Sequence, residues 1–523
     1  MKKVCIISFL SALVITVDAQ ITFQKTYGGT GNDGGSSVQQ TTDGGYIIAG
    51  GSRSFGAGNA DVYLIKTDAN GDSLWTKTFG GIGDDGGSSV QQTTDGGYII
   101  AGATGSFGSV LFDFYLIKTD ANGDSIWTKR LGGTNDDFGN SVKQTTDGGY
   151  IITGWTRSFG VGNFEVYLIK TNGNGNSLWS KTFGGFTNDI GNSVQQTTDG
   201  GYIIAGYTRS FGQVYFDVYL IKTNANGDLL WTKTFGGTAI EWCFSVQQTT
   251  DGGYIIAGET QSFGAGGWDV YLIRTDVNGN SLWAKSFGGA NDDYGYSVQQ
   301  TTDGGYIITG YTNSFGAGDY DVYLIRTDAN GDSLWSKTFG GANDDWGYSV
   351  QQTADEGYII TGNTYSFGAG NSSVYLIRTD SLGNSGCNQG NPATIVTTPA
   401  TIVLNPATIV TSPATIVTNP STVVGSGGIV NTLCTTVGIN EITTGNSFLI
   451  SPNPTSNTFT ITFPNTINTG TIEIYTVFGE KVFEETIHNT TTKEIRLKDI
   501  SAGIYFVKVV SEEKQYTQIV VIQ

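Results

Sequence analysis

Short apolar runs, separated by polar turns rich in glycine, recur along most of the chain. The first four runs are residues 37–41, 46–50, 62–67 and 74–79. Runs of this length that are rich in Ile, Val, Tyr and Thr are typical of β-strands. The intervening segments 42–45 and 68–72 contain Gly, which supplies the positive φ of a tight hairpin. The pattern predicts four antiparallel strands, with hairpins joining the first two and the last two.

This four-run unit recurs seven times with a constant period of 52 residues. One marker is the aspartate of a Thr-Asp-Gly-Gly turn, at Asp43, Asp95, Asp147, Asp199, Asp251, Asp303 and, in a variant of that turn, Asp355. A second marker is a tryptophan, at Trp75, Trp127, Trp179, Trp231, Trp283 and Trp335. A fixed period of this length indicates a propeller, a solenoid or an array. Four antiparallel strands per unit are typical of a propeller blade.

The phase of the units favours a closed ring over an open stack. The array begins with a lone strand at 23–27 and ends with the other three strands of a unit. Together they make one complete blade, which removes the two exposed edges that an open stack would have to cap. We therefore predict an all-β fold, a seven-bladed β-propeller with four-stranded blades over residues 20–386.

Four short motifs recur in the units. In one unit they are Phe79-Gly80-Gly81, Asp84-Asp85, Asp95-Gly96-Gly97-Tyr98 and Leu116-Ile117-Lys118-Thr119-Asp120. With these motifs the units resemble the bacterial SBBP β-propeller repeat. The resemblance covers all seven units and implies a fold, but no activity.

The first 19 residues have the features of a secretory signal peptide. Two lysines precede an apolar stretch at 4–17, and Val17-Asp18-Ala19 precedes the expected cut. Fourteen apolar residues are too few to span a bilayer as a helix. No later apolar run is long enough either, so we expect a secreted or outer-surface protein without a transmembrane anchor.

Residues 387–444 have a different composition, with a proline every seventh residue. These prolines are Pro392, Pro399, Pro406, Pro413 and Pro420. A proline in every heptad forbids a continuous helix, so the segment is predicted to be an extended Thr/Pro-rich linker. Cys387 and Cys434 flank it and either pair in an oxidising compartment or stay free.

Residues 445–523 are predicted to form a small Ig-like β-sandwich. Three motifs resemble the C-terminal sorting domain of type IX secretion substrates: 452–454, 472–482 and 501–509. Its motif residues are Pro452, Asn453, Pro454, Gly479, Gly503 and Tyr505. The resemblance implies handling by the type IX machinery, removal of the tail, and release or surface attachment. The alternative is an adhesive Ig-like module without a sorting role.

Composition excludes several classes of function. Charged residues are 14% of the chain and the net charge is −19, which disfavours binding to nucleic acid. The single histidine, His488, lies in the tail, so the propeller has no His-based triad or His-ligated metal site. We expect no cofactor; the one metal considered is Ca²⁺, on an acidic column that runs from Asp33 and Asp85 to Glu241 and Asp345. Because each member belongs to a different blade, a role in capping turns is the favoured interpretation.

The candidate binding face is the one that carries the variable loops. In a four-stranded meander, the loop between blades and the loop from second to third strand share a face, and these two loops hold nearly all the variation between units. The binding candidates there are Trp155, Tyr207, Trp242, Trp268, Tyr294, Tyr311, Trp346, Glu241 and Glu259. Aromatic faces beside polar edges suit a glycan or a protein surface, although aromatics also wedge between blades.

Three hypotheses of function follow. The favoured one is a non-catalytic binding or adhesion module. The second is a glycan hydrolase or lyase that uses Glu241 and Glu259 as a carboxylate pair. The third is a passive surface scaffold built from duplicated repeats.

Overall fold

The computed structural model describes residues 20–108, 111–212, 214–413, 415–418, 422–438, 448–455, 458–476, 481–497, 500–511 and 515–522. These residues form two compact units, one over Gln20–Gly438 and one at the C-terminal end. The predicted signal peptide, residues 1–19, lies outside the described residues.

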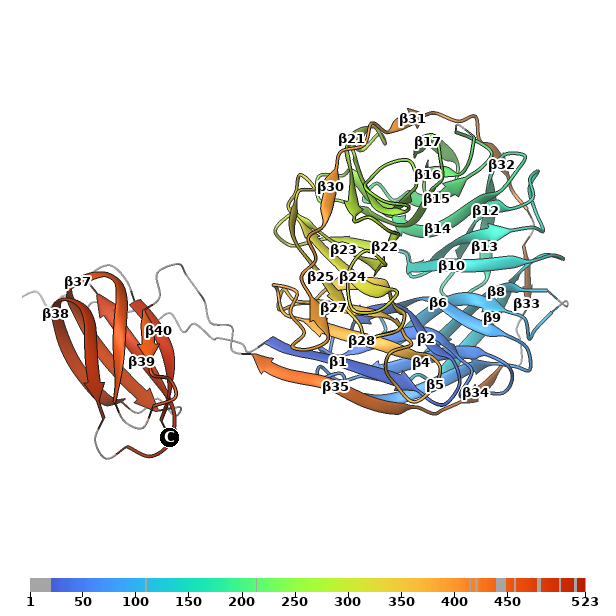
Figure 1. Ribbon diagram of the computed structural model, residues 1–523. Helices are drawn as coiled ribbons and strands as arrows, with labels where there is room; N and C mark the ends of the chain where they lie inside the picture. The colour runs from blue at the N-terminus through green and yellow to red at the C-terminus, as the bar shows by residue number, and fades with distance from the viewer. Residues whose placement is uncertain are drawn as a thin grey trace, which may run out of the picture. The chain divides into compact units, whose positions relative to one another are not determined.

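The first unit is a ring of seven five-stranded antiparallel sheets in the described part of the chain, so the predicted seven blades are confirmed (Figure 1). The first strands of the blades are β2 (Asp33–Gln40), β6 (Asp85–Gln92), β10 (Asp137–Gln144), β14 (Asp189–Gln196), β18 (Glu241–Gln248), β22 (Asp293–Gln300) and β26 (Asp345–Gln352). The second strands are β3 (Tyr46–Ser52), β7 (Tyr98–Thr104), β11 (Tyr150–Thr156), β15 (Tyr202–Thr208), β19 (Tyr254–Thr260), β23 (Tyr306–Thr312) and β27 (Tyr358–Thr364). The third strands are β4 (Asp61–Thr67), β8 (Asp113–Thr119), β12 (Glu165–Thr171), β16 (Asp217–Thr223), β20 (Asp269–Thr275), β24 (Asp321–Thr327) and β28 (Ser373–Thr379). The fourth strands are β5 (Ser73–Gly80), β9 (Ser125–Gly132), β13 (Ser177–Gly184), β17 (Leu229–Gly236), β21 (Ser281–Gly288), β25 (Ser333–Phe339) and β1 (Gln20–Gly28).

Local turn chemistry explains why the four strands fold back on one another. In the turn after β2, Gly44 has φ +84°, and the carboxylate of Asp43 accepts a hydrogen bond from the Gly45 N–H at 3.1 Å. In the turn after β4, Gly71 has φ +73°, and Asp68 accepts from the Asn70 N–H at 2.9 Å. Each Gly adopts a conformation that costs other residues energy, which fixes the hairpin register.

The ring closes as the sequence predicts. Strand β1 pairs with β28 in antiparallel register, with Phe23 opposite Arg378 and Tyr27 opposite Val374. The N-terminal strand therefore completes the seventh blade, and the first blade begins only at β2. Phe23 is fully buried in that blade, so closure also buries apolar area.

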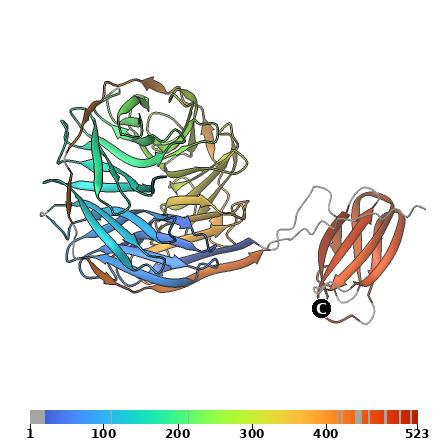
Figure 2. The ribbon, with the colours of Figure 1, turned by 180° about the vertical axis from the view of Figure 1, so that it is seen from behind.

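The segment expected to be a free linker is instead part of the propeller. Residues 389–438 run round the rim and add a fifth strand to every blade (Figures 1 and 2). In the order of the chain these strands are β29 (Gln389–Gly390), β30 (Ile395–Thr397), β31 (Ile402–Leu404), β32 (Ile409–Thr411), β33 (Ile416–Thr418), β34 (Val423–Gly425) and β35 (Ile429–Gly438). We call this segment the belt. Its first strand pairs with the sixth blade, and the following strands pair with the fifth to the first blade in descending order. The last belt strand, β35, pairs with β1 of the seventh blade.

The belt strands form because each proline falls between them. The Ile-Val-Thr triplets keep their N–H groups and pair with the fourth strands, as Val396 does opposite Phe287. One threonine per heptad also hydrogen-bonds the tyrosine of the blade beneath. These pairs are Tyr323–Thr394, Tyr271–Thr401, Tyr219–Thr408, Tyr167–Thr415 and Tyr115–Thr422. The outer edge of each blade is thus covered, which blocks edge-to-edge association.

A disulfide joins the two ends of the belt. Cys387, just before β29, is bonded to Cys434 in β35, and the two Cα atoms are 6.2 Å apart. Of the two alternatives left open by the sequence, the structure shows the paired one. Because the belt passes every blade between these cysteines, the bond closes a covalent loop around the rim.

The core of the ring lies between neighbouring blades. Each apolar cluster combines the side chains of two adjacent sheets, as Ile47 and Leu64 of the first blade pack with Ile100 and Tyr115 of the second. First strands of adjacent blades also touch, since the Val90 N–H donates to Ser37 Oγ at 3.2 Å. The first strands therefore line the centre of the ring.

The C-terminal unit is a five-stranded antiparallel sheet that encloses its own core. Its strands are β36 (Leu449–Ser451), β37 (Thr458–Thr476), β38 (Lys481–Arg496), β39 (Gly503–Ser511) and β40 (Gln515–Ile522). Ile461, Ile474, Val507 and Val520 are among the buried core residues. The predicted small all-β tail domain is confirmed. No helix in the described part of the chain is long and apolar enough to cross a bilayer.

Candidate binding face

The loops segregate onto two faces of the ring as predicted. The loop that enters each blade lies beside the loop between second and third strands of the preceding blade. For example, the Asp85 N–H donates to the carbonyl of Ala60 at 2.7 Å, and the Asp33 N–H donates to that of Ser372 at 3.1 Å. The hairpin turns lie at the opposite ends of the strands. The variable loops therefore share one face, which we call the variable face.

The first acidic column caps turns on this face. Asp33 accepts from the Gly29 N–H at 2.7 Å, and Asp85 accepts from the Gly81 N–H at 2.9 Å. Glu241 does the same with the Gly237 N–H at 2.9 Å and with the Thr260 hydroxyl at 2.9 Å. Among the described residues, no group of three or more His, Cys, Asp or Glu side chains could hold a metal ion. The hydrogen bonds of Asp33, Asp85 and Glu241 give the column the favoured turn-capping role.

A second column of buried acids was missed by sequence reasoning. Its members are Asp61, Asp113, Glu165, Asp217, Asp269 and Asp321, each at the start of a third strand. Acids of the two columns pack against the same glycine. A Cβ atom added to Gly132 would lie only 2.1 Å from Asp113 Oδ1 and 2.7 Å from Asp137 Oδ2, so both carboxylates lie close to this residue. Burial raises the pKa of Asp113 and of Glu165 to about 7. The signal in the sequence was an acid at the start of the aliphatic third run, repeated every 52 residues.

Most of the predicted aromatic candidates come together in one continuous cluster. Ring contacts link the fourth to the seventh blade through Tyr207, Phe216, Trp242, Trp268, Tyr294, Tyr311, Tyr320, Trp346 and Tyr365. We call this set the aromatic arc. Representative centroid distances are 5.0 Å for Trp242–Trp268 and 4.7 Å for Tyr294–Tyr311. Trp155 packs on Phe138 at 4.5 Å in the third blade.

The rings of the arc pack between blades and still reach solvent. Trp242, Tyr294, Tyr311 and Trp346 are all half-buried. The indole N–H groups of Trp242 and Trp346 are buried and have no hydrogen-bond partner among the described residues. Buried donors are normally paired, so these two stand out among the rings of the arc.

A small pocket lies where the arc ends. At the positions that carry aromatics in later blades, the first blade has Gly34 and Gly51, and these line a cavity of about 300 Å³. Tyr365 and Asn363 of the seventh blade form its other wall. The Asn363 side-chain oxygen accepts from the Gly35 N–H at 3.0 Å, which fixes that wall.

The two glutamates proposed as a catalytic pair do not face each other. In the β18–β19 pairing, Glu241 lies opposite Thr260, whereas Glu259 lies opposite Trp242. Because successive side chains of a strand point to opposite sides of a sheet, the two carboxylates lie on opposite sides. Glu241 caps its turn, and Glu259 lies among the arc residues. The geometry does not support the carboxylate-pair hypothesis.

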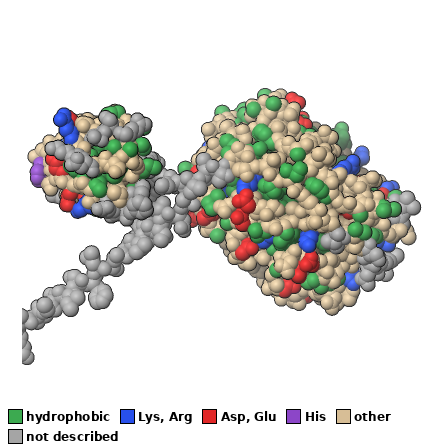
Figure 3. Space-filling view, turned by 90° about the horizontal axis from the view of Figure 1, so that it is seen from below, with side chains coloured by type: hydrophobic (Ala, Val, Ile, Leu, Met, Phe, Trp, Pro, Cys, Tyr) green, Lys and Arg blue, Asp and Glu red, His purple; other side chains and the backbone are tan. Residues whose placement is uncertain are grey.

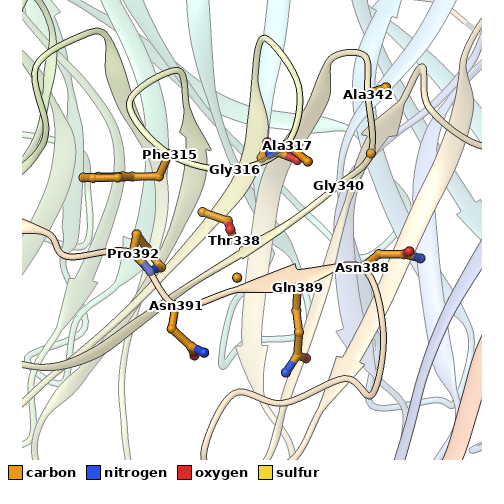
Figure 4. Close-up of a pocket in the computed structure, with 13 residues that line it drawn as sticks. Phe315, Gly316, Ala317, Thr338, Gly340, Ala342, Asn388, Gln389, Asn391 and Pro392 are labelled. Carbon is orange, nitrogen blue, oxygen red and sulfur yellow. Dashed lines mark hydrogen bonds between the residues drawn. The ribbon is translucent and has the colours of Figure 1, made fainter.

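A larger groove, of about 770 Å³, lies on the rim between the belt and the sixth blade (Figure 4). Phe315 and Ala317 line one side, and Asn388 and the first belt residue, Gln389, line the other. The Gln389 side chain points away from Phe315 (Figure 4). Glycine and alanine make up much of the lining, and the polar side chains of Asp321, Thr338, Asn388, Gln389 and Asn391 also line the groove.

The surface has no dominant charged region in the view of Figure 3, where acidic and basic side chains occur in small groups on a largely uncharged surface. This distribution agrees with the 14% of charged residues. It gives no extended basic surface in that view for an anionic polymer.

Comparison with known families identifies the C-terminal unit. Residues 449–523 match the family described as secretion system C-terminal sorting domain. The chain carries a type IX sorting domain. It is therefore exported, and it is attached at the cell surface or secreted. Within the sorting domain, the Asn453 side-chain oxygen accepts from the Val521 N–H at 2.9 Å, and the Tyr505 hydroxyl donates to the Ser501 carbonyl at 2.8 Å.

The other predicted motif residues occupy defined places or lie outside the described part. Pro452 and Pro454 flank Asn453 before β37, and Gly503 begins β39. Gly479 lies outside the described residues. The resemblance of the propeller units to the SBBP repeat stays a prediction.

The chain also shows weaker similarities to other proteins. Regulatory protein FlaEY of Caulobacter vibrioides is 27% identical over 174 residues, which cover 28% of this chain and 18% of that protein. The chain thus spans less than a fifth of that relative. Sqt1 from Chaetomium thermophilum is 12% identical with a TM-score of 0.38, covering 64% of this chain and 81% of Sqt1. A Bacteroides thetaiotaomicron protein of unknown function is 12% identical with a TM-score of 0.32, covering 64% of this chain and 84% of that protein.

Proposed function

We propose that the exported propeller is a non-catalytic binding module that holds a glycan or a protein surface on its variable face. The aromatic arc carries the proposal. It is a run of half-exposed rings, built on a scaffold whose other face hardly varies between units. Flat apolar rings with polar edges are the usual contact surface for sugars and for protein hot spots.

Two further features support this face over the rest of the molecule. The indole N–H groups of Trp242 and Trp346, which have no hydrogen-bond partner within the described part of the chain, lie at separate points along the arc. The pocket beside Tyr365 is large enough for the end of a chain-like ligand. A passive scaffold explains the repeats but not the aromatic variation confined to one face.

The test is a glycan array and a surface-protein pull-down with the full chain, followed by titration of the best binder. We expect Trp242→Ala to weaken binding at least tenfold. The matched control is Trp231→Ala, the same change at the hairpin-turn end of β17. There the ring packs on Tyr254, with the ring centroids 6.0 Å apart. Equal loss of affinity in both variants would place the ligand elsewhere.

A further inference from the structure

Glu259 is the one charged residue in its column. The equivalent positions in the other blades are Gly51, Ala103, Trp155, Tyr207, Tyr311 and Asn363. The Glu259 side chain is 1% exposed, and its Oε2 has no hydrogen-bond partner among the described residues. A buried carboxylate normally has a cation or several donors beside it, because burial without them is costly.

Aromatic rings surround this carboxylate. Trp242 lies opposite it in the neighbouring strand. Tyr207 of the fourth blade and Tyr311 and Tyr296 of the sixth are close enough for their hydroxyls to interact electrostatically with it. Tyr296 and Tyr311 are themselves within hydrogen-bond reach, 3.3 Å between hydroxyl oxygens. The Glu259 carboxylate therefore lies within the aromatic cluster.

The charged group that acts on Glu259, Asp292, has the same sign. Asp292 and burial together raise the pKa of Glu259 well above its usual range, and burial is the larger cause. Asp292 is itself held by the Trp268 N–H at 2.9 Å. A cation that entered here would find a carboxylate, a second acid and the faces of several rings.

We infer that the arc selects ligands that carry a protonated primary amine, which pairs with Glu259 and stacks on the rings of Trp242 and Tyr311. This inference rests on the proposed binding function and names the ligand class of the same site. An ammonium gains from both partners at once, because aromatic faces attract cations most strongly where water is excluded. A neutral hydroxyl or an N-acetyl group gains neither ion pairing nor cation–π attraction.

Two sources present such an amine, a de-acetylated amino sugar and a lysine side chain. The experiment uses the full chain and calorimetric titration with four probes in two pairs. The sugar pair is a glucosamine hexamer and the N-acetylglucosamine hexamer, and the peptide pair is a neutral-flanked lysine peptide and its acetyl-lysine counterpart. We expect the amine form to bind at least tenfold more tightly than its acetylated form in the sugar pair or the peptide pair. The pair that shows the difference identifies the source.

The variant Glu259→Gln keeps the shape of the side chain and removes its charge. It should abolish the preference for the amine form and leave binding of the acetylated form unchanged. Glu356 is an exposed glutamate in a hairpin turn, on the face opposite the variable face. Glu356→Gln is the matched control and should keep the preference. Amine binding should also release a proton from Glu259, visible as a heat that depends on the ionisation enthalpy of the buffer.

The inference is overturned if acetylated and amine forms bind equally, or if Glu259→Gln retains the preference. It is also overturned if neither amine probe binds while another ligand binds through Trp242; in that case the binding function stands. Absence of any ligand for the variable face overturns both.

Discussion

Breaking the belt disulfide should destabilise the whole propeller by an amount that can be calculated. The bond joins residues 47 apart in sequence. In the chain-entropy account, closing such a loop lowers the entropy of the unfolded chain by roughly 14 cal/mol/K, or about 4 kcal/mol at 25 °C. The propeller unit spans Gln20–Gly438, and at roughly 2 cal/mol/K per residue its unfolding entropy is close to 0.9 kcal/mol/K. The double variant Cys387→Ser, Cys434→Ser should therefore melt about 4–5 °C lower.

A local effect should accompany this global one. Strands β30 to β34 are each held by three residue pairs, and β29 by two, so none is stable alone once the loop is open. Limited proteolysis should then cut within residues 389–428 before it cuts the blades.

Differential scanning calorimetry and mass spectrometry of timed digests measure the two effects. Reductant added to the native protein should reproduce both, and reductant added to the double variant should change neither. An unchanged melting temperature together with a protease-resistant belt in the double variant would refute the argument that the disulfide holds the belt in place.

Two further predictions concern the ring itself. Burial raises the pKa of Glu165 to about 7 and of Asp269 and Asp321 to about 6, so these acids keep protons in the folded state that the unfolded chain releases near pH 4. The free energy of unfolding should accordingly fall as pH rises from about 4 to 7, by about 3 kcal/mol for Glu165 alone. Denaturant midpoints measured at pH 5 and pH 8 should show this fall. A higher midpoint at pH 8, or a dependence of the midpoint on pH that is no flatter in Glu165→Gln, would contradict the prediction. Phe23→Ala removes a fully buried ring from the closing strand and should cost about 3–5 kcal/mol in urea unfolding, whereas Ile82→Ala, at an 86% exposed position, should cost almost nothing.

Local patterns explain how much of this fold the sequence reveals. The hairpin turns around Gly44 and Gly71 and the constant period specify the blades, because each signal acts over a few residues. Ring closure follows from counting strands at the two ends of the array. The belt could not be foreseen in this way, because its partners lie up to several hundred residues away. Its prolines suggest a solvated spacer until the free blade edges are taken into account.

The binding face is predictable only in part. The alternation of loops places the aromatic candidates on one face correctly, and ring contacts join most of them. Sequence spacing could not show that Glu241 and Glu259 point to opposite sides of one sheet, since that depends on the pairing of β18 with β19. It also could not show that the Oε2 atom of Glu259 has no hydrogen-bond partner in the described part of the chain, because its neighbours come from other blades.

The belt ties the size of the ring to a second, shorter repeat. Seven residues of belt serve one blade of 52, and the tyrosine–threonine pairs keep the two counts in step, as Tyr271 with Thr401 and Tyr219 with Thr408. A duplication that inserted one more blade would leave the encircling segment one heptad short, and its cysteines could no longer meet. Gain of a blade therefore requires two matched insertions, one of 52 residues in the blades and one of seven residues in the belt. The length of the belt thus holds the number of blades constant.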